Sequence, residues 1–329
     1  MNRVEGTRVR DLILRGAVLL VALGIMVLTA DLGHLSASLH RIEPVYLLLI
    51  LILFFARMPV GALRWKILLQ DMGVALPLAE LQRISLASQF FGMLLPSANG
   101  SDIARGLMMK TPERQWSIIA ISILTDRLYG VAALFFLTLP ATLYMIAHGV
   151  SHPVVFLLAG ISAAAILTGI AFLIWIGSHS SVAASTEQPA TIWTRIGGAG
   201  PALLCTFRRP FAVASCLLLS LVAQILSVAS TWLTGVSMGF EIELAVYFAY
   251  VPVIWLITLL PISFLGIGVR EASFAALFAT LGIPATTGIA IGLLNSAIAI
   301  AVSLLSGLAI LLPARKPPPM ANNQESPRA

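Results

Sequence analysis

Charged side chains are scarce in this chain: only 10% of its 329 residues are Asp, Glu, Lys or Arg. A soluble domain carries roughly a quarter charged residues, because its surface must face water. An apolar content of 59% and a mean hydropathy of +0.97 agree with this deficit. The composition therefore excludes a soluble globular domain of this length and predicts an integral membrane protein.

Cysteine is nearly absent, and so are the motifs of nucleotide and metal chemistry. Cys205 and Cys216 are the only cysteines, which excludes a disulfide framework and a thiolate metal site. The five histidines show no metal-ligand spacing, and neither a Walker loop nor a dinucleotide fingerprint occurs. No basic residues cluster as nucleic-acid binding requires. We therefore expect no cofactor, no metal and no nucleic-acid partner.

Long apolar runs are what the sequence has instead. Runs of about 20 residues can cross the hydrocarbon core as helices. They predict an all-α, polytopic membrane helix bundle with about seven to eight membrane segments. We expect a single transmembrane domain over residues 1–312 and a disordered polar tail over 313–329. The full-length runs are Leu12–Ala30, Pro44–Leu63, Leu128–Ala147, Val154–Ile176, Phe211–Gly235, Leu244–Pro261 and Thr286–Leu312.

Two further apolar regions differ from these runs. Ile84–Pro96 is too short to span a bilayer, and Ile262–Leu281 is interrupted by glycines. Apolar runs of about 10–14 residues are typical of re-entrant or broken helices, which a membrane tolerates where protein buries them. The sequence therefore predicts two re-entrant or broken helices within the bundle.

Basic residues are distributed unevenly between the segments. Residues 1–11, 64–83 and 178–209 are rich in arginine and lysine, whereas 236–243 carries only two glutamates. Basic loops stay on the cytoplasmic side of a membrane. We therefore expect a cytoplasmic N-terminus, with the first apolar run retained as a span rather than cleaved as a signal peptide.

One stretch of the sequence is echoed half a chain later. Leu94-Leu95-Pro96 precedes Arg105, and Leu259-Leu260-Pro261 precedes Arg270 with the same spacing, 165 residues further on. Four of the twelve residues in each stretch are identical, so chance in a leucine-rich chain stays open. If the echo is real, halves 12–147 and 154–312 form an inverted repeat, as in many transporters.

A polar stretch directly follows the short run Ile84–Pro96. The proline ends the preceding helix, and Gly100 and Ser101 are typical of turns and helix N-caps. We expect a new helix near Ser101, with Asp102 and Arg105 on one face because they are three residues apart. A helix N-terminus beside an arginine can bind phosphate. An ordinary cytoplasmic loop is the alternative.

The second polar stretch lies within residues 261–271. Gly266 and Gly268 permit close backbone approach. Arg270 and Glu271 are adjacent, so on a helix they point in different directions and each needs another partner or a ligand. Charged groups at membrane depth are functional candidates by default. The alternative is an interfacial loop in which both side chains are hydrated.

Asp126 and Arg127 interrupt the apolar stretch Ile118–Ala147. As one helix this stretch would be about 45 Å long, more than the hydrocarbon core of about 30 Å. The two residues therefore either mark an interfacial bend before a span at Leu128, with snorkelling side chains, or belong to a polar site.

Three cations near the end of Pro44–Leu63 are open to a simpler interpretation. Arg57 lies six residues from the end of this run, about 9 Å along a helix, so its side chain could nearly reach the headgroups. Arg64-Trp65-Lys66 places an aromatic between two cations, a pattern typical of an interfacial anchor. We therefore expect a structural role for these residues.

The ordered set of motifs resembles the lysylphosphatidylglycerol synthase transmembrane-region family, whose members are often described as flippase-like. The resemblance covers nearly the whole chain, with two departures: Asp126 stands where glutamate is commoner, and Ser97-Ala98-Asn99 replaces a more glycine-rich stretch. The motifs are Arg64-Trp65-Lys66-Ile67-Leu68-Leu69, Leu95-Pro96-Ser97, Gly100-x-Asp102-x-x-Arg105, Asp126-Arg127, Leu260-Pro261, Gly266-Ile267-Gly268-Val269-Arg270-Glu271-Ala272 and Leu281-Gly282-Ile283-Pro284.

The resemblance implies a multi-pass protein of the bacterial inner membrane that moves or handles lipids. Some members carry a soluble aminoacyl-transferring domain after this region; none follows residue 312 here, so lysyl transfer is not expected. Our hypothesis is a flippase-like transporter whose site comprises Gly100, Ser101, Asp102, Arg105, Asp126, Arg127, Gly266, Gly268, Arg270 and Glu271, with membrane lipids as partners. The alternatives are a membrane-embedded transferase or accessory subunit acting on a lipid-linked substrate, and a structural partner of a membrane enzyme.

Overall fold

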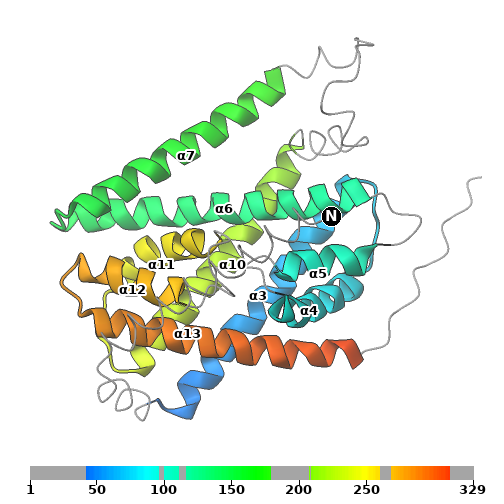
Figure 1. Cartoon of the computed structure of the whole chain (residues 1–329). Helices are drawn as coiled ribbons and strands as arrows, with labels where there is room; N and C mark the ends of the chain where they lie inside the picture. Colours follow the sequence, from blue (N-terminus) through cyan, green and yellow to red (C-terminus); the bar gives the residue numbers. More distant parts are fainter. Residues whose placement is uncertain are drawn as a thin grey trace, which may run out of the picture.

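The computed structural model describes residues 42–95, 100–110, 116–178, 207, 209–259 and 268–311. All secondary structure in this part of the chain is helical (Figure 1), which confirms the predicted all-α polytopic membrane bundle. The predicted span Leu12–Ala30 and the tail 313–329 lie outside these residues. Five helices are long and apolar enough to cross a membrane: α3 (Pro44–Asp71), α6 (Trp116–Ala147), α7 (Pro153–Ser178), α10 (Pro210–Ser237) and α13 (Ala285–Ser306).

The remaining helices are short and occur in pairs. They are α4 (Leu78–Leu94), α5 (Gly100–Met109), α11 (Leu244–Thr258) and α12 (Val269–Ala279), with a 3₁₀ turn, η1 (Gly307–Leu311), after α13. The predicted full-length span Leu244–Pro261 was wrong, because α11 has only 15 residues. The apolar run continues beyond the end of the helix, so hydropathy alone does not show where the helix ends.

The start of α4 was also predicted wrongly. The helix begins at Leu78 rather than Ile84, because Glu80 and Arg83 lower the hydropathy of its first turns without breaking the helix. They form an ion pair of 2.7 Å across three residues, which stabilises a helical surface. At 17 residues α4 is still short for a bilayer, as expected of a re-entrant element.

Each short pair folds back beside the long helices that flank it. One apolar cluster joins Leu69 of α3, Leu81 of α4, Met109 of α5 and Ile119 of α6. The start of α4 and the end of α5 therefore lie together, next to the end of α3 and the start of α6. Such a helical hairpin enters the bundle and returns to the same end.

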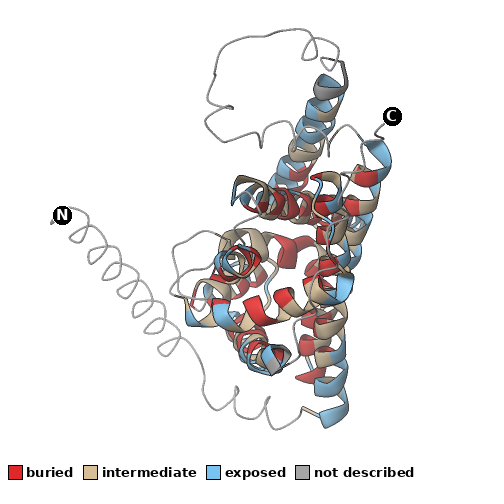
Figure 2. Cartoon of the chain, turned by 90° about the vertical axis from the view of Figure 1, so that its right-hand side faces the viewer, coloured by how far each residue is buried: buried red, intermediate tan, exposed pale blue. Residues whose placement is uncertain are grey.

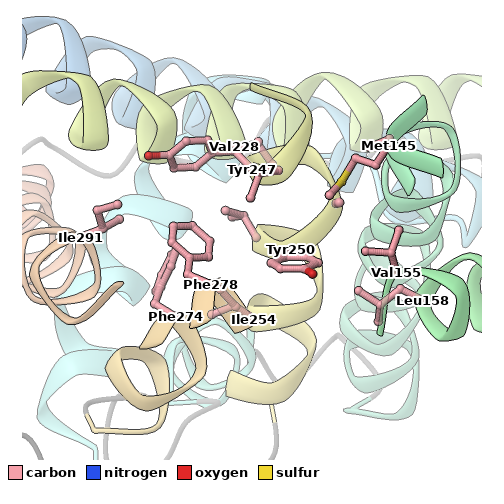
Figure 3. Close-up of a cluster of buried hydrophobic side chains, with 14 residues drawn as sticks. Met145, Val155, Leu158, Val228, Tyr247, Tyr250, Ile254, Phe274, Phe278 and Ile291 are labelled. Atoms are coloured by element: carbon pink, nitrogen blue, oxygen red, sulfur yellow. The ribbon is translucent and has the colours of Figure 1, made fainter. Parts of the chain in front are cut away.

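The second hairpin, α11 and α12, is held by an aromatic cluster (Figure 3). Phe274 and Phe278 of α12 stack edge to face with ring centroids 5.6 Å apart, and Tyr247 of α11 meets Phe278 at 5.8 Å. All three side chains are fully buried. Edge-to-face aromatic pairs stabilise beyond their buried area, so this cluster fixes α12, the helix that carries Arg270 and Glu271.

The helices repeat their order after half the chain. In both sets a long helix is followed by two short helices and another long one, and α6 and α13 run in opposite directions (Figure 1). Sequence comparison gave an offset of 165 residues, but the helices do not keep it. Pro44 of α3 and Pro210 of α10 are 166 residues apart, as are Leu78 and Leu244, whereas Gly100 and Val269, and Trp116 and Ala285, are 169 apart.

Helices that correspond in the two sets also make corresponding contacts. The first long helices, α3 and α10, pack along each other, α4 packs against α13 and η1, and α11 packs against α6. Figure 2 shows buried residues turned to the inside of this assembly and exposed ones on its outside. Helix α7 packs on α6 through Val155 and Leu158 and otherwise presents apolar residues outward, as a lipid-facing helix does.

Candidate functional site

Asp126 is the centre of the first polar cluster. Its Oδ1 accepts a hydrogen bond from Arg64 Nε at 2.7 Å, and its Oδ2 accepts one from Arg105 Nη1 at 3.1 Å. Asp126 is only 5% exposed. One carboxylate from α6 therefore joins an arginine of α3 to an arginine of α5 inside the bundle.

The structure corrects the proposed bend at this position. Helix α6 is continuous from Trp116 to Ala147, about 48 Å long, so no break separates Asp126 and Arg127 from the apolar residues that follow them. Asp126 does not snorkel, since it has two arginine partners. The adjacent Arg127 pairs with Asp102 of α5, and both are more exposed than the Asp126 cluster. Asp102 and Arg105 thus share a face of α5, as predicted, and bind neighbouring residues of α6.

Arg64-Trp65-Lys66 is not an interfacial anchor. Helix α3 continues through these residues to Asp71, and Trp65 is fully buried. Trp65 donates a hydrogen bond from Nε1 to Ser122 Oγ at 3.2 Å, and the Arg105 guanidinium lies 3.8 Å from its ring centroid. The indole therefore supports Arg105 by a cation–π contact. A sequence pattern gives depth along a helix but not the face on which a side chain lies.

A hydrogen-bonded chain holds the second polar cluster. Arg270 Nη1 donates to Ser296 Oγ at 3.1 Å, and Ser296 Oγ donates to Glu271 Oε1 at 2.5 Å. Glu271 Oε2 accepts from the backbone N–H of Gly268 at 2.6 Å, which caps α12. Gly268 adopts φ of +83°, a conformation that glycine takes without strain. Glu271 is therefore bound within the protein, and Ser296 links it to its neighbour Arg270, which lines the cavity described below.

Arg57 does not behave as a snorkelling residue. It lies 4.0 Å from the ring centroid of Phe54, and its Nη1 is 3.5 Å from Ser227 Oγ of α10. Arg270 lies similarly against Trp255, 5.2 Å from that ring. Three arginines of the site thus rest on aromatic rings, which leaves the edges of their guanidinium groups to donate elsewhere.

These side chains surround one cavity of about 460 Å³ between the two helix sets. Ligand sites of proteins commonly have volumes of about 300–1,000 Å³. The lining combines arginines and carboxylates with hydroxyls, amides and apolar residues. It comprises Phe54, Arg57, Met58, Gly61, Ala62 and Arg64 of α3; Ser85, Ser88 and Gln89 of α4; Ser101, Asp102 and Arg105 of α5; Asp126, Arg127, Gly130, Val131 and Leu134 of α6; Ala223, Gln224, Ser227 and Ser230 of α10; Trp255, Thr258 and Leu259 at α11; Arg270 of α12; and Asn295 and Ala299 of α13.

Six of the ten predicted site residues line this cavity: Ser101, Asp102, Arg105, Asp126, Arg127 and Arg270. Glu271 stands behind Arg270, and Gly268 caps its helix. Gly100 has a packing role, because a Cβ there would collide with the Gly92 carbonyl of α4. Gly266 lies outside the residues that the structure describes.

Several lining residues were not in the predicted site. Arg57 and Arg64 were assigned to the interface, while Gln224 and Asn295 were not considered. A signal existed for the last two, since each is an amide inside a long apolar run and polar residues at membrane depth are costly. Gln224 donates to the Gly130 carbonyl at 3.4 Å, and Asn295 receives a hydrogen bond from Thr231 at 3.3 Å.

The cavity lies where equivalent positions of the two sets meet. Asp102 and Arg127 of the first set are 25 residues apart, as are Glu271 and Ser296 of the second, and both pairs are hydrogen-bonded. The first set supplies more charge and the second more neutral polar groups. Equivalent lining residues are Arg57 and Ala223, Met58 and Gln224, Gly61 and Ser227, and Arg64 and Ser230, each 166 apart, and Asp126 and Asn295, and Gly130 and Ala299, each 169 apart.

Two arginine atoms on the cavity wall are left without a partner. Arg105 Nε and Arg270 Nε are buried and meet no hydrogen-bond acceptor among the residues seen in the structure. An unsatisfied buried donor costs free energy, more so on a charged group. In the same part of the chain no three His, Cys, Asp or Glu side chains gather as a metal site requires. The chemistry of the wall therefore suits an anionic ligand.

Comparison of the sequence with protein-family profiles gives the same family that the motifs suggested. The profile of the family described as Lysylphosphatidylglycerol synthase TM region matches residues 12–307, a stretch that contains every helix lining the cavity. This match confirms the resemblance. No curated protein matches the chain at a significant level.

Proposed function

Because the chain belongs to the lysylphosphatidylglycerol synthase transmembrane-region family, we propose that it is a lipid transporter of flippase type that binds phosphate-bearing headgroups in its cavity. The family and the apolar helices identify a multi-pass membrane protein. The step from there to headgroup binding rests mainly on one observation: arginines with spare donors surround a cavity inside the helical body.

Arg105 and Arg270 are the proposed phosphate ligands. Each lies on an indole ring, and each has a buried Nε without an acceptor in the described part of the chain. Guanidinium groups bind phosphate through paired N–H donors. Asp102 and Glu271 already have partners, Arg127 for the first and Ser296 with Gly268 for the second. These carboxylates therefore balance charge rather than bind the headgroup.

The repeated helix order supports transport over simple storage of a lipid. Transporters often place the substrate at the interface of two repeats that run in opposite directions, next to broken helices. The cavity here has that position, with a hairpin of short helices from each set beside it. In this proposal, each hairpin, α4–α5 and α11–α12, changes its packing against the long helices in turn. The cavity would then open first to one side of the membrane and next to the other.

Replacing Arg270 with alanine tests the proposed function. We expect translocation of a phospholipid in proteoliposomes to slow by about tenfold or more, the effect of losing a charge-assisted hydrogen bond. The matched control is Arg83→Ala, which removes an arginine outside the cavity. Both variants should melt close to the wild type. Translocation that is unchanged in folded Arg270→Ala would overturn the assignment.

We further propose that the protein resides in a bacterial inner membrane with its N-terminus cytoplasmic. The basic residues of 1–11, 64–83 and 178–209 support this orientation. A cysteine introduced at Ser185 should resist a membrane-impermeant thiol reagent in intact cells and react once the membrane is opened. Labelling in intact cells would contradict the orientation.

A further inference from the structure

The charges around the cavity do not cancel. Arg57, Arg64, Arg105, Arg127 and Arg270 line it together with Asp102 and Asp126, and Glu271 reaches Arg270 through Ser296. Among the residues that the structure describes, five arginines against three carboxylates leave an excess of two positive charges. In a soluble protein solvent ions would screen this excess, but inside a membrane protein screening is weak.

The five arginines differ in their direct partners. Asp126 neutralises Arg64 and Arg105 in part, and Asp102 pairs with Arg127. Arg57 and Arg270, by contrast, have no carboxylate within ion-pair distance among the residues that the structure describes. Their polar contacts are the hydroxyls of Ser227 and Ser296. Both guanidinium groups line the same cavity.

Two cations without a direct ion-pair partner are costly inside a bilayer. A buried charge without a counter-charge destabilises a protein, and ionisable residues at membrane depth are kept where they meet a substrate or a partner. Arg105 and Arg270 also hold spare donors toward the same space. An anion bound between the two sides of the cavity would compensate the excess positive charge and satisfy the donors at once.

We propose that the cavity selects lipids whose headgroup carries two negative charges on phosphate and no amine, namely phosphate monoesters and diphosphates. This inference rests on the proposed lipid-handling function and narrows its substrate class. A phosphate monoester carries about 1.5 to 2 negative charges at pH 7, which matches the excess. A zwitterionic headgroup brings a cationic group that the excess arginines repel, and the carboxylates that could attract it already have partners.

Lipid binding to the purified full chain, measured by native mass spectrometry and displacement, tests this selectivity. The probes are phosphatidic acid, phosphatidylglycerol and phosphatidylethanolamine with identical acyl chains. We expect phosphatidic acid to bind about tenfold more tightly than phosphatidylglycerol, equivalent to about 1.4 kcal/mol, and phosphatidylethanolamine to bind most weakly. Arg57→Gln and Arg270→Gln should each shrink this preference, whereas Arg83→Gln should keep it.

The outcomes distinguish a failure of the proposed selectivity from a failure of the proposed function. Equal binding of phosphatidic acid and phosphatidylglycerol would overturn the selectivity and leave the proposed function standing. Binding of none of the three lipids would remove the proposed function as well. Inorganic phosphate that binds as tightly as phosphatidic acid would assign the cavity to the free anion and overturn the lipid selectivity. Because Arg57→Gln and Arg270→Gln each remove a cation that has no direct ion pair in the described part of the chain, both should fold, which a melting curve checks.

Discussion

Asp126→Asn is expected to destabilise the folded bundle by about 3 to 5 kcal/mol, the usual cost of removing one partner from a buried ion pair. The carboxylate is 5% exposed and accepts hydrogen bonds from both Arg64 and Arg105. An asparagine of the same shape keeps one acceptor oxygen but no charge. Two buried guanidinium groups would then face each other without a counter-charge, and α3, α5 and α6 would lose their common link.

Thermal unfolding in detergent measures this effect. Glu80→Gln is the matched control, because it removes a carboxylate from a more exposed ion pair within α4 and should cost only about 0.2 to 0.5 kcal/mol. A fall in melting temperature for Asp126→Asn well beyond that of Glu80→Gln supports the assignment of Asp126 as the link. Equal melting temperatures would mean that the Asp126 cluster is not held as the structure shows.

Replacing the whole cluster with apolar residues should separate stability from function. Arg64→Met/Arg105→Met/Asp126→Leu leaves no charge at these three positions, and exchange of a buried ionic triad for apolar side chains is often neutral or stabilising. Methionine can also keep contact with the Trp65 ring through its sulfur. We therefore expect this variant to regain about 3 kcal/mol relative to Asp126→Asn, yet to lose lipid translocation because Arg105 is gone.

The two readouts, melting and proteoliposome translocation, are needed together. A variant that is as unstable as Asp126→Asn would show that these side chains are needed for the fold in their own right. A stable variant with wild-type translocation would show that the cluster does not handle lipid. Only stability without translocation agrees with a polar site kept for its function.

The sequence was sufficient for the membrane class and for much of the polar site. Hydropathy and the low charge content predicted the helical bundle, and a proline followed by turn residues pointed to Asp102 and Arg105. Arg270 followed from the glycine-rich stretch before it. These residues were identifiable because each lies beside a break in an apolar run, where a polar side chain differs most from its surroundings.

Residues inside uninterrupted helices were harder to interpret. Arg57 and Arg64 lie close to a predicted helix end, so depth alone favoured a headgroup contact, but each contacts a polar side chain of another helix. The partner that decides the outcome, such as Ser227 or Asp126, is 62 or more residues away in sequence. No local pattern encodes such a pairing.

The sequence comparison aligned the two halves of the repeat with the wrong offset. Aligning Arg105 with Arg270 requires an offset of 165, yet the hydrogen bonds make Asp102 equivalent to Glu271, and Arg127 equivalent to Ser296. The first half has an ion pair between Asp102 and Arg127, whereas the second half has a hydrogen bond between Glu271 and the neutral hydroxyl of Ser296. Identity therefore fades at the site itself, and only the helix starts and the contacts reveal the equivalence.

Photo-crosslinking with a lipid that carries its reactive group on the phosphate headgroup tests the central claim, that the headgroup enters the cavity. We predict crosslinks to cavity residues such as Met58 and Leu134, lost on competition with unlabelled lipid. Crosslinks confined to outward-facing residues such as Leu167 and Ile174 of α7, each 66% exposed, would contradict it.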